Sequence, residues 1–69
     1  MYLVCNISPT DLQIEVQYQV ARRAISHCIL VPAGQGIDFE AYAPRDTLRK
    51  DPRLVEFSRR GMIKIVEKE

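Results

Sequence analysis

The stretch LQIEVQYQV, residues Leu12–Val20, constrains the fold more than any other part of this sequence. Apolar and polar residues alternate there across all nine positions, without one exception. The apolar set is Leu12, Ile14, Val16, Tyr18 and Val20. A period of two places each set on its own face of a β-strand, whereas a helix would scatter both sets around its axis. The pattern therefore predicts a strand with one buried face and one hydrated face.

Four further segments have the composition of strands, namely residues 1–7, 24–31, 37–41 and 62–66. Residues 21–23 form the expected bend between the alternating strand and the strand 24–31. The strand 24–31 carries apolar residues on both faces. A strand of that kind is expected at the centre of a sheet, or with its second face covered by another element.

The segment VPAGQG joins the strand 24–31 to the strand 37–41 through a sharp corner. Pro32 lacks the N–H that a strand ladder needs, so it ends the first of these strands. Gly34 and Gly36 are expected to supply the positive φ angles of a tight reversal. Phosphate-binding loops have more glycines and lead into a helix, so this corner predicts a turn and no phosphate site.

A helical region precedes the last strand. Asp46 is expected to cap a first turn through TLRK. Asp51 followed by Pro52 has the residue types of an N-cap and first helical position, which predicts a helix through Arg60. Gly61 then stands where a glycine commonly ends a helix.

These segments predict a mainly β (α+β) fold, with a small antiparallel sheet or partial barrel of about five strands and one short helix before the last strand. The chain has 69 residues, which is too few for two cores. We therefore expect a single β-rich domain over residues 1–69.

No catalytic, cofactor-binding or metal site is expected from the residue types and their spacing. Cys5 and Cys28 are the two cysteines and His27 is the one histidine, which is too few for a structural zinc site. His27 and Cys28 are neighbours in a strand, so they point to opposite faces and do not form a catalytic pair. No apolar run approaches the roughly 20 residues that cross a bilayer, so no membrane partner is expected.

The charges are unevenly distributed. Residues 45–60 hold six basic against three acidic residues, a local charge of +3, while residues 1–44 hold two basic against four acidic, a local charge of −2. The bases of the first group are Arg45, Arg49, Lys50, Arg53, Arg59 and Arg60. The net charge of +1 gives no global field that attracts a polyanion, and local pairs such as Arg60 with Glu56 are favoured. A small nucleic-acid-binding regulator using residues 45–60 is the alternative function, and an enzyme acting through His27 ranks below it.

The order of motifs in the last 40 or so residues resembles that of small bacteriophage virion proteins. The pieces are ILVPAGQGIDF, DPRLVEFSRRG and MIKIVEKE, which give an apolar strand, a corner, an acid-bearing strand, a helix, a glycine and a last strand. The resemblance implies a non-enzymatic structural subunit that acts as a capsid decoration, cement or head-tail accessory protein. It implies location in the virion and binding to the major capsid protein or another virion protein.

The small size of the chain leads independently to association. A domain of about 60 residues buries only about 60% of the surface that its unfolded chain exposes. No disulfide framework or metal site is expected to compensate for this small buried area. We therefore expect association with a partner to stabilise the chain, and we expect a homo-oligomer. The residues expected at the partner interface are Tyr2, Val4, Phe39, Tyr42, Arg49 and Arg53.

Overall fold

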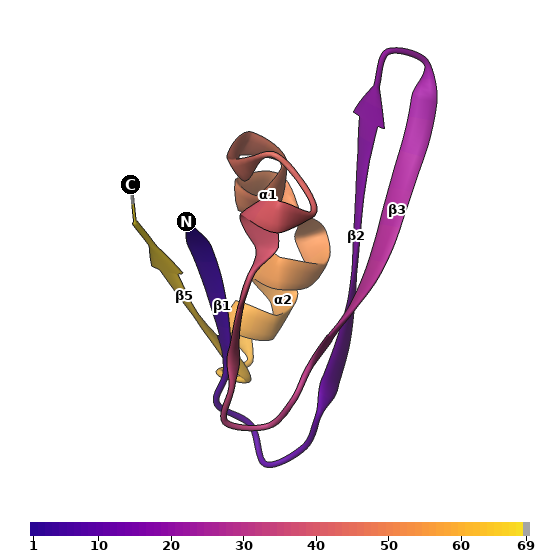
Figure 1. Cartoon of the computed structure of the whole chain (residues 1–69). Helices are drawn as coiled ribbons and strands as arrows, with labels where there is room; N and C mark the ends of the chain where they lie inside the picture. The colour runs from indigo at the N-terminus through magenta and orange to yellow at the C-terminus, as the bar shows by residue number, and fades with distance from the viewer. Residues whose placement is uncertain (69) are drawn as a thin grey trace.

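The computed structural model describes residues 1–68, which form five strands, two α-helices and one short 3-10 helix (Figure 1). In chain order the elements are β1 (Tyr2–Asn6), β2 (Leu12–Val20), β3 (Arg23–Val31), β4 (Gly36–Asp38), the 3-10 helix η1 (Phe39–Ala41), α1 (Arg45–Lys50), α2 (Pro52–Arg59) and β5 (Ile63–Glu67). The predicted mainly β fold, with helical structure before the last strand, is confirmed. The TLRK turn extends into a separate helix, α1, so two helices stand where one was expected.

The strands form two antiparallel sheets, which corrects the expectation of one sheet or partial barrel. The first sheet has the order β4-β1-β5, with Val4 of the central strand opposite Ile37 on one side and Ile65 on the other. The second sheet is the hairpin of β2 and β3. The helices lie between them in Figure 1, and α2 contacts both β2 and β5.

The hairpin runs in continuous register from Leu12 opposite Val31 to Val20 opposite Arg23. β3 is therefore not the central strand that its two apolar faces predicted. Among residues 1–68 it pairs with β2 alone, and Cys28 and Leu30 on its second face are exposed. Apolar residues on both faces of a strand are buried on both faces only where another segment packs on the second face. Cys28 and Leu30 stay exposed, so no segment of the described chain covers them.

The hydrophobic core receives side chains from both sheets and all three helices. Its buried members are Tyr2, Val4, Leu12, Ile14, Val16, Ile29, Val31, Phe39, Ala43, Leu48, Leu54 and Ile63. The hairpin contributes only from its half nearest the corner, because Leu12, Ile14 and Val16 are buried while Val20 is exposed. The alternation predicted the buried face correctly for the first part of the strand.

Asn6 is a buried polar residue that joins the two sheets at this end. Its Nδ2 donates hydrogen bonds to the carbonyl oxygens of Thr10, at 2.8 Å, and Val31, at 2.9 Å. Its Oδ1 accepts from the backbone N–H of Ser8 at 2.9 Å and from the Ser8 hydroxyl at 2.6 Å. One side chain thus connects the end of β1, the following turn and the end of β3.

The corner after β3 differs in detail from the prediction. Gly34 has the expected positive φ of +78°, but Gly36 does not and belongs to β4. A Cβ at Gly36 would lie 3.1 Å from Sγ of Cys5, so a glycine there allows β4 to approach β1 closely. Gly36 therefore serves strand packing, and Gly34 serves the reversal.

The strand predicted over residues 37–41 is shorter than expected, since β4 ends at Asp38. The Asp38 carboxylate accepts hydrogen bonds from the N–H of Glu40, at 3.0 Å, and of Tyr2, at 3.1 Å. The bond to Glu40 caps the N-terminus of η1, which competes with the extended conformation.

The helix-terminal prediction at Asp51 is confirmed and that at Asp46 is wrong. The Asp51 carboxylate accepts hydrogen bonds from the N–H groups of Arg53, at 2.9 Å, and Leu54, at 3.2 Å, and Pro52 occupies the first turn. Gly61 follows the helix with a φ of +73°. Asp46 lies inside the first turn of α1, whose N-terminal flanking residue is a proline, Pro44, that makes no side-chain cap.

Candidate interaction surface

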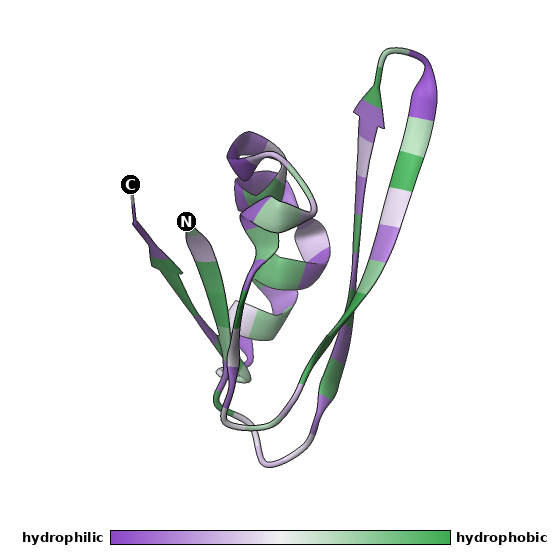
Figure 2. Cartoon of the chain, in the orientation of Figure 1, coloured by the Kyte–Doolittle hydropathy of each residue, from purple (hydrophilic) through white to green (hydrophobic). Residues whose placement is uncertain are grey.

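The distal half of the hairpin, residues 17–26, extends away from the core and is here called the arm. The arm reaches past α1 in Figure 1, and none of its ten residues is buried. Hydrophobic residues nevertheless continue along it, as the green bands in the upper part of β2 and β3 show in Figure 2. A two-stranded ribbon without a packed face is at best marginally stable in water, so these apolar side chains require a physical explanation.

An aromatic and aliphatic cluster, here called the arm face, combines one face of the arm with His27, the next residue on that face of β3, and Tyr42, which follows η1. It comprises Tyr18, Val20, Ile25, His27 and Tyr42. The His27 ring stacks on Tyr18 with centroids 6.2 Å apart, and it meets the edge of Tyr42 at 5.6 Å. Val20 is 52% exposed and Tyr42 is 39% exposed.

A shallow groove runs between the arm and residues 40–44, which are the end of η1 and the segment after it. Tyr18 and Val20 line one side, and residues 40–44 line the other. Its open edge and exposed valine suit contact with another protein better than enclosure of a small molecule. This arrangement makes the arm face the candidate interaction surface.

Three of the six predicted interface residues lie in the chain's own core, and this corrects the prediction. Tyr2 is 4% exposed, and Val4 and Phe39 are not exposed at all. Val4 is on the central strand between β4 and β5, and Phe39 begins η1, which contacts β1 and α1. Their apolar character reflects the need of this small domain for a core, so they offer no contact to a partner in this fold.

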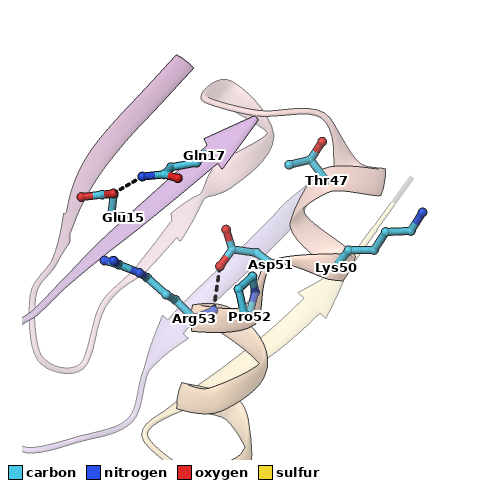
Figure 3. Close-up of a pocket in the computed structure, with 7 residues that line it drawn as sticks. All are labelled: Glu15, Gln17, Thr47, Lys50, Asp51, Pro52 and Arg53. Carbon is cyan, nitrogen blue, oxygen red and sulfur yellow. Dashed lines mark hydrogen bonds between the residues drawn. The ribbon is translucent and has the colours of Figure 1, made fainter. Parts of the chain in front are cut away.

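The other three predicted residues are exposed but do not form one patch. Tyr42 belongs to the arm face. Arg49 pairs with Glu67 at 2.8 Å and lies 3.9 Å from Asp46. Arg53 lines a separate cleft between β2 and the α1–α2 junction, together with Glu15, Gln17 and Lys50 (Figure 3).

Sequence reasoning missed Val20 and Ile25 as surface residues. Their alternating spacing assigned them to the same face as the buried Leu12, Ile14 and Val16, and that assignment of the face is correct. The missing information is the length of the hairpin. Each of its strands has nine residues against five in β1, so its far end runs beyond the body. The sequence gives little sign of this difference, since the strands expected from it span residues 1–7, 12–20 and 24–31.

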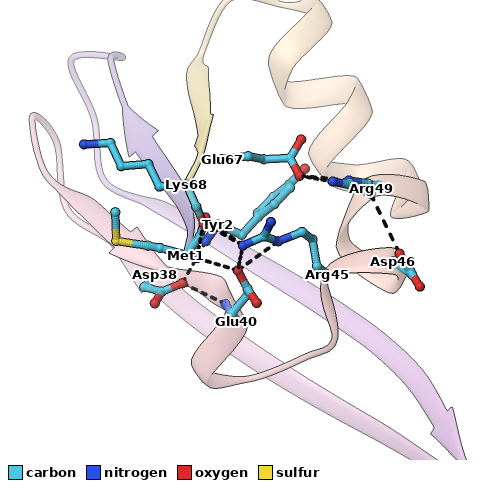
Figure 4. Close-up of polar contacts among 9 residues, drawn as sticks. All are labelled: Met1, Tyr2, Asp38, Glu40, Arg45, Asp46, Arg49, Glu67 and Lys68. Carbon is cyan, nitrogen blue, oxygen red and sulfur yellow. Dashed lines mark hydrogen bonds and ion pairs between the residues drawn. The ribbon is translucent and has the colours of Figure 1, made fainter.

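A network of charged groups joins Met1 and Lys68 to Glu40 and Arg45 (Figure 4). The Glu40 carboxylate lies 2.8 Å from the N-terminal amine and also accepts hydrogen bonds from the Arg45 guanidinium. The hydrogen bond from the N-terminal amine has the largest effect, followed by that from Arg45, and together they hold the pKa of Glu40 below its usual value. Arg45 also donates to the carbonyl oxygen of Lys68 at 2.7 Å, which ties the start of α1 to the residue after β5.

Ion pairs within the chain engage part of the basic segment 45–60. Arg49 pairs with Glu67, and Arg60 pairs with Glu56 at 2.8 Å, as the sequence predicted for the latter pair. With Arg45 bound to Glu40, three of the six basic residues are engaged by acids of this chain. Burial, followed by the charge of Glu67, raises the pKa of the Tyr2 hydroxyl beneath this network. The segment is therefore less available to a polyanion than its local charge suggests.

Within residues 1–68, no group of three or more histidine, cysteine or acidic side chains is placed to hold a metal ion. Both cysteines are free thiols, with Cys28 exposed and Cys5 half-buried. His27 contacts the rings of Tyr18 and Tyr42. The described part of the chain also contains no helix with the length and apolar character needed to cross a membrane.

The sequence matches no family model, and neither the curated proteins nor the solved structures contain a significant match to it.

Proposed function

We propose that this chain is a non-enzymatic structural subunit that docks on a larger protein assembly through the arm face. The observation that carries the proposal is the arm face, where Val20 and Tyr42 remain exposed outside the core on and beside a ribbon of only two strands. Contact with a partner would bury Val20 and Tyr42 and would stabilise the ribbon. Removing a valine side chain from water contributes roughly 1.5 to 3 kcal/mol.

The assembly we propose is a bacteriophage particle, with the chain as a decoration, cement or head-tail accessory protein. The support for this is the order of motifs from Ile29 onward and the small size of the domain. The partner is then the major capsid protein or another virion protein, and the chain is found in the virion.

Co-sedimentation with purified particles of the phage that encodes the chain tests both parts. Val20→Asp places a charge on the arm face, and we expect it to lower the affinity for particles roughly ten- to a hundredfold. The matched control is Leu30→Asp, because Leu30 is 53% exposed, close to the 52% of Val20, but lies on the opposite face of the hairpin. Absence of the wild-type chain from particles, or equal loss in the two variants, would refute the proposal.

The alternative function, nucleic-acid binding through residues 45–60, rests on Lys50, Arg53 and Arg59, which have no acidic partner among residues 1–68. It predicts an affinity for DNA or RNA that falls steeply as salt rises, because bound phosphates release counterions. Titration of labelled oligonucleotides at two ionic strengths separates it from protein docking. We expect no binding at low salt.

A further inference from the structure

The outer edge of β3 is an unpaired β-strand edge. In the hairpin, Val20 and Arg23 flank a loop of two residues and face each other, which makes them a hydrogen-bonded pair. Hydrogen-bonded and non-hydrogen-bonded pairs then alternate along the ribbon. The backbone N–H and C=O groups of Ala24, Ser26 and Cys28 therefore point away from β2. No backbone bond to these groups is found within residues 1–68.

The side chains at these outward positions leave the edge accessible. Ala24, Ser26 and Cys28 are small, and all three are exposed. Natural proteins commonly block open edges with charges, prolines, bulges or short strands. Over residues 23–31, β3 has no proline and no charged residue after Arg23.

The other open edges of the fold are protected in ways that the β3 edge is not. β4 has only three residues, and β5 carries Lys64 and Glu67. β2 carries Glu15, and its side of the hairpin faces the α1–α2 junction across the cleft of Figure 3. Among the described strands, β2 and β3 are the long ones with one charged residue each, and the β3 edge is the one of these two that does not face the helices.

We propose that two copies of this chain pair antiparallel along their β3 edges, with the two-fold axis at Ser26, to form a continuous four-stranded sheet. Ser26 then lies opposite Ser26 of the partner subunit, and Ala24 lies opposite Cys28 of the partner subunit. The two Arg23 residues stand six positions apart, about 20 Å, which exceeds the screening length of about 8 Å in physiological salt. Charge repulsion between the two copies therefore does not oppose this self-pairing.

The symmetry has a consequence for the arm face. A two-fold axis that relates antiparallel strands within one sheet is perpendicular to that sheet, so equivalent faces stay on the same side. The two arm faces then form one apolar surface, and the two bodies lie at opposite ends of the joined ribbon. The inference extends the proposed docking function, but the pairing itself needs no docking partner.

The buried area sets the expected strength. Seven paired residues extend over about 24 Å, and a sheet about 10 Å thick then gives roughly 500 Å² for both copies. Stable interfaces bury about 1,200 Å² or more. We therefore expect a weak dimer that forms at high concentration, or when copies are held close together on an assembly.

Sedimentation velocity of the purified chain from micromolar to millimolar concentration tests the pairing. We expect the mean mass to rise from the 7.9 kDa of one chain toward twice that value. Ser26→Pro removes an outward N–H without removing a bond to β2, and it should abolish the rise. The matched control is Gln17→Pro, because Gln17 is directly opposite Ser26 and its N–H points to the other edge. This control should still dimerise.

A wild-type chain that stays monomeric at millimolar concentration would overturn the proposal. So would loss of the dimer in Gln17→Pro, with Ser26→Pro unaffected or equally affected. Circular dichroism checks that each variant is folded. If Ser26→Pro unfolds, Ala24→Cys decides, since oxidised glutathione should then link the new thiol to Cys28 of the partner subunit. Absence of a covalent dimer in that variant would also overturn the pairing. The co-sedimentation assay with particles tests docking only, so its result does not depend on whether two copies pair.

Discussion

Replacement of Asn6 tests how the two sheets are held together. Asn6 is 1% exposed and makes four side-chain hydrogen bonds, two as donor to the Thr10 and Val31 carbonyl oxygens and two as acceptor from Ser8. Asn6→Ala removes all four. Of the four bonds, the one to the Val31 carbonyl oxygen is buried and the other three are part-buried, so the largest share of the cost falls on the Val31 carbonyl oxygen.

The expected cost follows from these contacts. A net hydrogen bond contributes about 1 kcal/mol, and loss of a partner in a buried site costs about 1 to 3 kcal/mol. We expect Asn6→Ala to lower the free energy of unfolding by about 2 to 3 kcal/mol. The whole chain is expected to be stable by about 3 to 10 kcal/mol at its length, so this single side chain holds a large share of the total.

Urea unfolding followed by circular dichroism measures the effect. With a dependence on urea of about 1 kcal/mol per molar for so small a domain, the midpoint should fall by about 2 to 3 M. Ser8→Ala is the control, because it removes a hydroxyl at the surface end of the same group, and it should cost less than about 1 kcal/mol. A midpoint for Asn6→Ala equal to that of Ser8→Ala would refute the assignment of Asn6 as the link between the sheets.

Three other predictions concern the turn, the charge network and the aromatic residues. Ala21 has a φ of +55° in the hairpin loop, so Ala21→Gly should raise stability by roughly 0.5 kcal/mol in the same urea assay, and a loss would contradict that backbone geometry. The depressed pKa of Glu40 means that its contribution is present above its ordinary pKa of 4.5 and is lost as pH falls through the folded value. Glu40→Gln should therefore be less stable than wild type at pH 7 and should approach it in acid, and a gap that stays constant with pH argues against the network. Phe39→Ala should cost about 3 to 5 kcal/mol as a core truncation. Tyr42→Ala should leave the urea midpoint nearly unchanged but weaken particle binding, and a large loss of stability would place Tyr42 in the core instead.

Local sequence patterns predicted local structure well. The alternation of Leu12–Val20 gave a strand and its inward face, and the Asp51, Pro52 and Gly61 positions gave the limits of α2. These features depend on interactions between residues a few positions apart, such as a capping carboxylate and the next N–H groups. A sequence pattern is therefore sufficient to predict an element whose stabilising interactions join residues close together in the chain.

The candidate interface could not be predicted in the same way. Phe39 and Val20 are both apolar residues that alternate with polar neighbours, yet Phe39 is fully buried and Val20 is half exposed. Which of them faces solvent depends on how far each strand extends past the elements that cover it. The predicted interface therefore named three core residues and omitted the arm.

The amino-acid sequence alone determined the alternating strand Leu12–Val20 and the limits of the α2 helix, because periodicity and caps act between residues a few positions apart. Tertiary structure decided the division into two sheets, the burial of Asn6 and the open edge of β3. Those features depend on contacts between segments such as β1 and β3, more than 20 positions apart, as Asn6 and Val31 are. Only the folded chain brings such segments together, and only then does it become clear which apolar residues remain uncovered.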